Sequence, residues 1–289
     1  MRRINIKTKR YIKRWIAAVL LLATIAAAVV VAWNIRPDHP YLNALLRDTK
    51  YFSFYDQIIM RDPSLPLNPY DKGSFSMSED RMTYLADNYY IRNGIDVSSY
   101  QGKIDWTSVA EDGIDFAFVR VGIRGSTEGG LYADSRYEAN IDGAQQAGIE
   151  TGVYIFSQAI NAEEGREEAE FVLSLLDGRE LQMPVVFDWE YVGEDARTYD
   201  IPKEQLGEAC NAFCSAITEA GYTPLVYFNC YTAYLCYELS DIIQYDFWLA
   251  QYTDYPTFQY DFDYWQYSCT GNVAGIDGDV DLNLQFIEQ

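Results

Sequence analysis

The chain has 289 residues, 49% of them hydrophobic, which is enough to bury one large core or two modest ones. Its formal net charge is −21, with 22 basic against 43 acidic residues. Because phosphate recognition needs clustered Lys and Arg, this balance argues against a nucleic-acid-binding protein. Residues 1–36 hold eight of the basic residues and no acid, which leaves 14 basic against 43 acidic residues, a net −29, for the remainder. This asymmetry predicts a basic membrane-proximal end followed by an acidic body.

The first predicted element is an apolar helix bounded by Trp15 and Trp33. No charged residue lies between them, and the segment is about as long as a bilayer core requires. The basic residues before it predict a cytoplasmic tail over 1–14, and the two Trp suit the membrane interfaces. We expect an uncleaved signal-anchor over 15–33, hence a single-pass protein of the cell membrane in which everything after Arg36 lies outside the cytoplasm. A cleaved signal peptide and a buried soluble helix are the alternatives.

The next segment, 34–91, is rich in Tyr, Asp and Pro and has weak periodicity. It predicts a juxtamembrane stalk or an extension that packs onto the body. The sole His is His39, and the five Cys form no CxxC pair, so a zinc site is not expected. Most of the Cys are expected to be buried and reduced.

From Gly94 onward, short apolar runs alternate with amphipathic segments, a pattern typical of parallel βα units. The expected strands are 94–99, 116–123, 151–157, 183–190, 223–229, 246–252, 263–268 and 279–286, and the expected helices are 105–113, 133–148, 161–178 and 202–221. Each helix ends at a Gly, as a left-handed C′ residue requires. Residues 92–289 therefore predict an α/β fold, a modified (β/α) TIM-like barrel with fewer helices in its second half. A doubly wound open sheet is the alternative, but no Gly-rich phosphate loop follows the first strand.

In such a barrel, functional residues lie where the strands end. Polar and aromatic residues occur at those positions on all eight predicted strands. These residues are Asp96, Arg120, Tyr154, Asp188, Glu190, Tyr227, Asn229, Gln251, Tyr252, Trp265, Gln266 and Asp281. Any one of them could be a packing residue, but together they predict one site.

The residue types in this site restrict its chemistry. The body contains no His, which excludes Ser-His-Asp and Cys-His catalysis. Carboxyls, aromatics and amides suit glycoside hydrolysis, which needs a proton donor and a carboxylate that supports an oxocarbenium-like centre. In "PVVFDWE" (184–190), Asp188 and Glu190 point to one side of a regular strand, whereas Trp189 points away, toward the barrel–helix packing. Two neighbouring carboxyls disfavour joint ionisation, which raises one pKa and supplies an acid near neutral pH.

The chain resembles glycoside hydrolase family 25, the Chalaropsis-type lysozymes, over about residues 92–288. The motifs that carry the resemblance appear in the family's order: "GIDVSSYQGKIDW" (94–106), "FAFVRVG" (116–122), "GVYIFS" (152–157), "PVVFDWE" (184–190), "WLAQY" (248–252), "WQYS" (265–268) and "GDVDLN" (278–283). The resemblance implies a modified barrel that cleaves the β-1,4 bond between N-acetylmuramic acid and N-acetylglucosamine in peptidoglycan.

The resemblance also implies roles for the carboxyls. Glu190 would be the general acid, Asp188 would support the reaction centre, and Asp96 and Asp281 would line the groove as the remaining catalytic carboxyls. The other residues at the strand ends are expected to bind substrate. Where many members have a His after the third-strand Tyr, this chain has Ile155, which is expected to alter a subsite contact.

Two other functions are weighed against a membrane-anchored muramidase. One is a chitinase-like β-N-acetylhexosaminide hydrolase, although the longer acidic signature of such enzymes is missing before Asp188. The other is a non-catalytic cell-wall-binding barrel, which the intact set of four carboxyls disfavours. The expected partners are peptidoglycan glycan strands and, through the N-terminal helix, the membrane. No cofactor or metal is expected, and whether hydrolysis retains or inverts configuration stays open.

Overall fold

The computed structural model describes residues 51–78 and 81–289, and the chain divides into two compact units, Met1–Pro63 and Ser64–Gln289. The predicted tail and membrane segment lie outside the described residues. Among the residues that are described, no helix has the length and apolar character needed to cross a membrane. The described part of the first unit is an antiparallel hairpin of β1 (Tyr51–Phe54) and β2 (Gln57–Met60).

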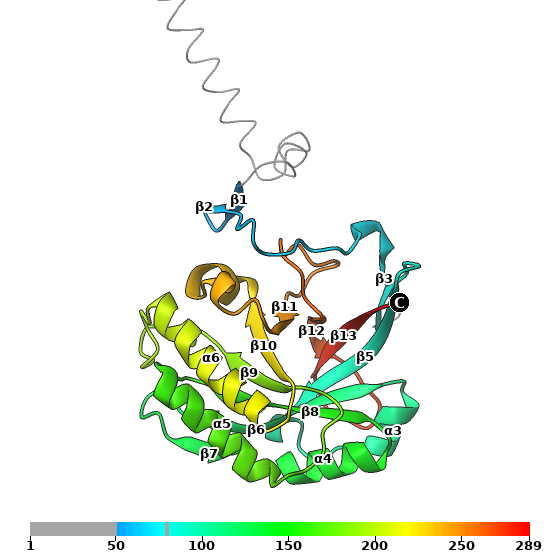
Figure 1. Cartoon of the computed structure of the whole chain (residues 1–289). Helices are drawn as coiled ribbons and strands as arrows, with labels where there is room; N and C mark the ends of the chain where they lie inside the picture. Colours follow the sequence, from blue (N-terminus) through cyan, green and yellow to red (C-terminus); the bar gives the residue numbers. More distant parts are fainter. Residues whose placement is uncertain (1–50, 79–80) are drawn as a thin grey trace, which may run out of the picture. The chain divides into compact units, whose positions relative to one another are not determined.

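The second unit is built around a closed barrel of eight strands (Figure 1). The sheet closes because β5 pairs with β6 on one side and with β13 on the other. In barrel order the strands are β5 (Tyr89–Val97), β6 (Phe116–Arg124), β8 (Glu150–Ser157), β9 (Val185–Trp189), β10 (Pro224–Asn229), β11 (Asp246–Ala250), β12 (Tyr264–Gly271) and β13 (Val280–Glu288). This confirms the predicted α/β barrel. A short strand beside β6, β7 (Leu131–Ala133), was not predicted.

One barrel strand runs against the others. β13 is antiparallel to both of its neighbours, β12 and β5. Asp281 therefore lies near the start of its strand and not at the end, as the sequence pattern had suggested. Its register partner is Asp96, near the end of β5. The reversal thus brings the first residues of β13 to the rim where the parallel strands finish.

The helices cover the first half of the barrel (Figure 1). They are α3 (Trp106–Glu111), α4 (Tyr137–Gln146), α5 (Ala162–Leu176) and α6 (Lys203–Glu219). The glycines after them adopt positive φ, as predicted: 82° at Gly113, 81° at Gly148, 75° at Gly178 and 89° at Gly221. After β10 the connections carry short turns, η3 (Thr232–Cys236) and η4 (Leu239–Asp241), in place of long helices. The expected loss of helices in the second half is confirmed.

Residues 64–88 pack on the side of the barrel that lacks helices. They include the turn η1 (Lys72–Ser74) and the hairpin strands β3 (Phe75–Ser78) and β4 (Arg81–Tyr84). The Tyr70 ring stacks on Phe286 of β13 with centroids 4.0 Å apart, and its hydroxyl donates to the carbonyl of Phe262 at 2.6 Å. Phe75 meets Trp265 of β12 edge to face at 5.3 Å. These aromatic contacts bury surface of β12 and β13 that helices cover elsewhere.

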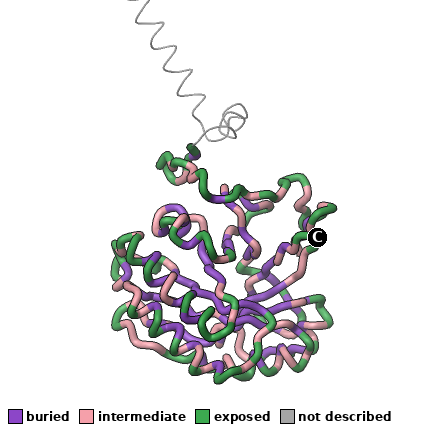
Figure 2. The backbone as a smooth tube through the Cα atoms, viewed as in Figure 1, coloured by how far each residue is buried: buried purple, intermediate pink, exposed green. Residues whose placement is uncertain are grey.

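A hydrophobic core fills the barrel below the rim. Its aromatic members come from neighbouring strands and interlock; the ring of Phe118 on β6, for example, stacks on Trp248 of β11 with centroids 4.6 Å apart. Figure 2 shows the strands as the most continuously buried part of the chain. The barrel interior is therefore packed, as in other barrels of this class, and does not form a channel.

The five cysteines are all unpaired. Cys210 and Cys214 are buried on α6, Cys230 and Cys236 are half-buried, and Cys269 is exposed. The sequence predicted buried reduced thiols for most of the Cys; the pair on α6 is buried as predicted, whereas Cys230, Cys236 and Cys269 are not fully buried.

Candidate active site

A cavity of about 270 Å³ lies at the rim where the parallel strands end, and we call it the carboxylate cavity. It gathers nine of the twelve residues predicted from the strand ends. Its lining consists of Asp96, Arg120, Tyr154, Phe156, Asp188, Glu190, Tyr227, Trp248, Tyr252, Gln266 and Asp281. These side chains come from all eight barrel strands or from the residues that closely follow them, so the fold itself assembles the site.

Three predicted residues do not line this cavity. Trp265 is fully buried and points away from it, donating its indole Nε1–H to the carbonyl of Gln251 at 2.8 Å. Because successive side chains on a strand alternate, Trp265 and Gln266 could not both face the cavity. The Gln251 amide binds Thr257, and the Asn229 Oδ1 accepts from the backbone N–H of Thr232. These three residues hold local structure together.

Two lining residues, Phe156 and Trp248, were not predicted. Phe156 lies two residues after Tyr154 on β8, so the alternation of the strand brings it to the same face. Both sit inside apolar runs, where a search for polar strand ends does not find them. Ile155, the departure from the family pattern, is fully buried and does not line the cavity, so the expected change in a subsite contact is not seen there.

The acidic pair of "PVVFDWE" lies as the strand alternation predicts. Asp188 and Glu190 both line the carboxylate cavity, whereas Trp189 is fully buried outside it and donates its Nε1–H to the carbonyl of Ala159 at 3.2 Å. With Asp96 and Asp281 from the opposite wall, four carboxyl groups share one small cavity.

Asp96 is held by two amide side chains. Its Oδ2 accepts from Gln266 Nε2 and from Asn283 Nδ2, both at 2.8 Å. The oxygens of these amides accept in turn from ring donors: Tyr227 Oη at 3.0 Å and Tyr252 Oη at 2.9 Å for Gln266, and Trp248 Nε1 at 2.9 Å for Asn283. Each amide is thereby fixed with its N–H groups toward Asp96. Asn283 is part of the "VDLN" motif, but no role had been predicted for it.

The four carboxyls all bind protons more tightly than usual. Burial raises the pKa of Asp188, and the charges of Glu190 and Asp96 raise it further. For Asp96 and Glu190, burial is the main cause of the raised pKa and the charge of Asp281 is the second. Burial raises the pKa of Asp281 itself to about 6. Among the described residues, Asp188 Oδ1 has no hydrogen-bond partner although it is buried. The cavity can therefore hold a protonated carboxyl near neutral pH.

The four carboxyls of the cavity have little positive charge near them to balance their negative charge. Among the described residues that line it, Arg120 carries the one positive charge. Its guanidinium is already paired with Asp134, with Nη2 and Oδ2 2.8 Å apart. Burial by itself would raise the pKa of Asp134, but hydrogen bonds from the backbone N–H groups of Ser99 and Arg136 and from Arg120 lower it overall. Arg120 therefore offsets little of the negative charge.

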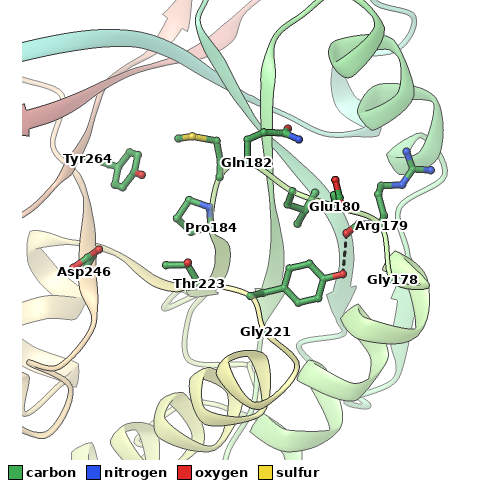
Figure 3. A pocket seen from close by; sticks show the side chains of 12 residues that line it. Gly178, Arg179, Glu180, Gln182, Pro184, Gly221, Thr223, Asp246 and Tyr264 are labelled. Carbon is green, nitrogen blue, oxygen red and sulfur yellow. Dashed lines mark hydrogen bonds between the residues drawn. The ribbon is translucent and has the colours of Figure 1, made fainter.

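A second cavity, of about 630 Å³, lies at the opposite end of the barrel (Figure 3). Its lining residues lie just before β9 and β10 or at the start of β11 and β12, and they include Arg179, Glu180 and Asp246. Figure 3 shows Glu180 and Asp246 on opposite walls, and the Tyr222 hydroxyl donates to the carbonyl of Arg179 at 2.8 Å. Although this cavity is larger, it brings no carboxyl pair together, and barrel enzymes use the other end. The carboxylate cavity is the candidate active site.

The carboxyls of the site are not arranged as a metal centre. Across residues 51–78 and 81–289, no group of three or more His, Cys, Asp and Glu side chains is placed to hold a metal ion. What the geometry does provide is a proton donor, carboxylates and aromatic walls in one cavity, which is the equipment of acid-catalysed glycoside cleavage.

The comparisons with known proteins agree with this chemistry. The family model described as Glycosyl hydrolases family 25 matches residues 95–276. Lysozyme M1 of Streptomyces globisporus is 34% identical over 209 residues, which cover 66% of each chain. The autolytic lysozyme of Clostridium acetobutylicum is 29% identical over 192 residues, covering 66% of this chain and 54% of that protein. The chain thus spans somewhat less than two thirds of the first relative and about half of the second.

The fold also matches solved structures. The crystal structure of the bacterial lysozyme from Streptomyces coelicolor is similar with a TM-score of 0.58 and 30% identity, and the match covers 66% of this chain and 90% of that one. The modular autolysin LytC from Streptococcus pneumoniae has a TM-score of 0.61 at 18% identity, covering 82% of this chain and 67% of that one, and supports the fold alone.

Proposed function

The chain belongs to glycoside hydrolase family 25, and from this premise we propose that it is a membrane-anchored muramidase. Its reaction would be hydrolysis of the β-1,4 bond between N-acetylmuramic acid and N-acetylglucosamine in peptidoglycan. The observation that carries the proposal is the convergence of four proton-binding carboxyls, Asp96, Asp188, Glu190 and Asp281, in one cavity at the barrel rim.

Glu190 is the proposed general acid. Burial and the charge of Asp281 raise its pKa, which keeps it protonated closer to neutral pH. Its proton passes to the glycosidic oxygen as the bond from that oxygen to the anomeric carbon breaks. A water molecule then adds its oxygen to the anomeric carbon and returns a proton to Glu190. The net reaction consumes one water and restores the enzyme.

Asp188 is the proposed support for the reaction centre. Its Oδ1 has no hydrogen-bond partner among the described residues, so a substrate group can bind this oxygen without displacing a protein contact. Burial raises the pKa of Asp188 strongly, and Arg120 is the neighbour that favours its ionised form. Positive charge that develops on the sugar ring would favour the carboxylate further.

Recognition would depend on sugar contacts more than on charge. The acidic body repels anionic wall polymers, since the net charge of the chain is −21. The walls of the cavity instead offer the rings of Tyr154, Tyr227 and Trp248, and Tyr252 is 53% exposed beside them. Flat rings and hydroxyls of this kind suit pyranose faces. The proposed partner is therefore the glycan strand of peptidoglycan, with no cofactor.

The membrane anchor is part of the same proposal. The basic tail 1–14 and the apolar segment 15–33 support a signal-anchor that places the catalytic domain outside the cytoplasm, with 34–91 as the connecting extension and 92–289 as the barrel. Membrane fractionation of the full chain tests it. The full chain is expected to stay in the membrane pellet after a high-salt wash, and a chain lacking residues 1–36 is expected in the soluble fraction.

Product analysis tests the reaction. Detergent-solubilised full-length protein is incubated with purified peptidoglycan, the products are reduced with borohydride, and mass spectrometry identifies the new ends. Muramidase activity predicts N-acetylmuramitol ends that are absent with the Glu190→Gln variant. N-acetylglucosaminitol ends, or cleavage of chitin alone, would favour the chitinase-like alternative. Binding to cell walls without any release would favour a non-catalytic barrel.

A further inference from the structure

Glu190 lies just past the end of a barrel strand. Strand β9 ends at Trp189, whose register partner on β8 is Ser157, so Glu190 comes just after the last paired residue. Residues 190–202 then run without helix or strand until α6 begins at Lys203. The pairing of the barrel therefore does not fix the backbone of the proposed acid, and another contact must do so.

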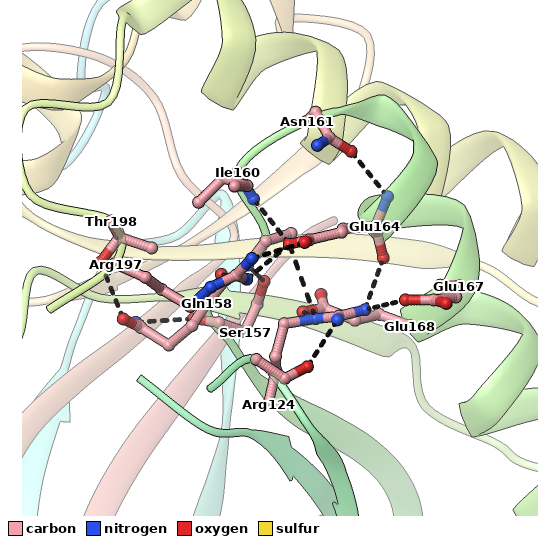
Figure 4. Close-up of polar contacts among 12 residues, drawn as sticks. Arg124, Ser157, Gln158, Ile160, Asn161, Glu164, Glu167, Glu168, Arg197 and Thr198 are labelled. Carbon is pink, nitrogen blue, oxygen red and sulfur yellow. Dashed lines mark hydrogen bonds and ion pairs between the residues drawn. The ribbon is translucent and has the colours of Figure 1, made fainter. Parts of the chain in front are cut away.

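That contact is the side chain of Gln158, which directly follows β8. Gln158 is fully buried, and its Nε2 donates to the carbonyl of Glu190 at 2.8 Å and to the carbonyl of Ser157 at 2.8 Å. Its Oε1 accepts from Thr198 Oγ1 at 2.8 Å. One amide thus joins Glu190, the first residue of the 190–202 segment, to Thr198 near its other end, and Figure 4 shows the contact with Thr198.

Arg197 holds the far end of the segment in place. Its Nη1 donates to the carbonyl of Gln158 at 3.0 Å, and its two terminal nitrogens bind the two carboxylate oxygens of Glu164 at 2.6 Å each. Such a two-point pair fixes both distance and orientation. A Cβ on Gly129 would lie 2.8 Å from Arg197 Cζ, so the guanidinium also depends on a glycine at that position.

A second arginine ties this arrangement to the barrel. Arg124, at the end of β6, donates from Nε to Glu168 Oε1 at 2.7 Å and from Nη2 to the carbonyl of Glu164 at 3.1 Å. Arg124 is 3% exposed and Glu168 is fully buried. We call Arg124, Glu164, Glu168 and Arg197 the ion-pair cluster. It anchors the first turns of α5 and, through Arg197, the segment that begins with Glu190 (Figure 4).

We propose that Gln158 is a positioning residue for the reaction: its amide holds the backbone of Glu190 so that the carboxyl stays at the rim of the carboxylate cavity. This inference rests on the proposed role of Glu190 as general acid. The Gln158 amide donates to the backbone carbonyl of Glu190 and does not line the cavity. It would therefore affect the reaction only by positioning Glu190. Displacement of a catalytic group by about 1 Å can cost about 10²-fold in rate.

The Gln158→Leu variant tests the proposal, because leucine has a similar volume and cannot hydrogen-bond. The expected result is a fall of about 10- to 100-fold in kcat with KM changed by less than about threefold. The alkaline limb of the kcat/KM profile should move to lower pH, because a released Glu190 loses part of the burial that raises its pKa. A carbon-13 NMR titration of the Glu190 carboxyl, assigned with the Glu190→Gln variant, should show the same lowered pKa without relying on activity.

Gln145→Leu is the matched control. The amide of Gln145 likewise donates to a backbone carbonyl, that of Glu180 at 3.1 Å, and to Thr151 Oγ1 at 2.8 Å, at the other end of the barrel. The same substitution there should leave kcat and the pH profile unchanged. Thr198→Val, which removes the donor to Gln158 Oε1, should produce a smaller change of the same sign, and Thr198→Ser should restore wild-type behaviour.

The outcomes separate the two proposals. A folded Gln158→Leu protein with wild-type kcat, alkaline limb and Glu190 titration would overturn the positioning role. If Gln158→Leu does not fold, Thr198→Val decides by the same three measurements. If the wild type releases no muropeptides, the proposed function fails, and the NMR titration still decides whether Gln158 controls the environment of Glu190.

Discussion

Two sets of buried charged side chains in this barrel differ in how their charges are balanced. The carboxylate cavity holds Asp96, Asp188, Glu190 and Asp281 with one arginine, which is already bound to Asp134. The ion-pair cluster offers two arginines to two buried or half-buried glutamates. In the cavity, burial raises the pKa of all four carboxyls, and neighbouring negative charges raise the pKa of Asp96, Asp188 and Glu190 further, whereas the cluster pairs its charges to hold chain segments in place. Both sets of carboxyls include buried members, so burial alone does not distinguish them. The difference is that the glutamates of the cluster are paired with arginines, whereas the carboxyls of the cavity are not.

Glu168 shows how far burial alone acts. It is fully buried in the ion-pair cluster, and burial raises its pKa to about 7 although Arg124 lies 2.7 Å away. Glu164, which is more exposed, shows the reverse: burial would raise its pKa, but the hydrogen bonds from Arg197 and from the backbone of Ile160 lower it overall. A raised pKa alone therefore does not identify a catalytic acid. In the cavity the raised pKa values occur together with an open space and several neighbouring carboxyls, and this combination supports the proposed role of Glu190.

The largest expected effect is on catalysis and comes from the cavity. Glu190→Gln should lower kcat about 10³-fold, because general acid catalysis contributes about 10² to 10⁴. Its free energy of unfolding at pH 7 should not fall, because a neutral amide replaces an acid that has no paired cation. Kinetics on purified peptidoglycan and urea denaturation measure the two quantities. Glu194→Gln, exposed in the same segment, is the control; a Glu190→Gln enzyme as active as this control would refute the assignment.

The next effect is on stability and comes from the ion-pair cluster. Arg124→Met should lower the free energy of unfolding by about 3 kcal/mol, because it leaves the buried carboxyl of Glu168 without its cation. Urea denaturation at pH 7 measures the loss. The double variant Arg124→Met with Glu168→Leu should recover most of it, because apolar side chains can replace a buried ion pair. A double variant no more stable than the single one would contradict the compensation described here.

The smallest expected effect concerns pH and stability. Burial raises the pKa of folded Asp281 to about 6 from 3.8, so the folded state binds this proton more tightly than the unfolded chain does. The stabilising contribution is complete below the unfolded pKa and is lost as the pH rises through about 6. The melting temperature of Asp281→Asn should therefore rise relative to wild type between pH 5 and pH 7, by about 2–4 °C for a difference of about 1 kcal/mol. If calorimetry gives the same difference in melting temperature between Asp281→Asn and wild type at pH 5 and at pH 7, the pKa of Asp281 is not raised in the folded state.

The sequence patterns predicted the parallel strands and the acids at their ends well, because alternation and helix-ending glycines are local signals. Asp188 and Glu190 face one cavity for this reason. The direction of β13 was not predicted, since an apolar run looks the same whichever way the strand runs. Trp265 was misplaced because it adjoins Gln266 at a strand end and only one of the two can point inward. The role inferred for Gln158 depends on contacts with Glu190 and Thr198, 32 and 40 residues away, which no local pattern encodes.

The reversed strand β13 also determines where the chain leaves the barrel. Since β13 starts at the cavity rim, with Asp281 as its second residue, it finishes at the opposite end, where the backbone N–H of Gln289 donates to the carbonyl of Asn88 at 3.0 Å. The end of β13 therefore meets the start of β5. A fluorescent protein or an affinity tag fused after Gln289 would project from the end of the barrel opposite the cavity mouth, which makes that position suitable for labelling the protein without obstructing substrate.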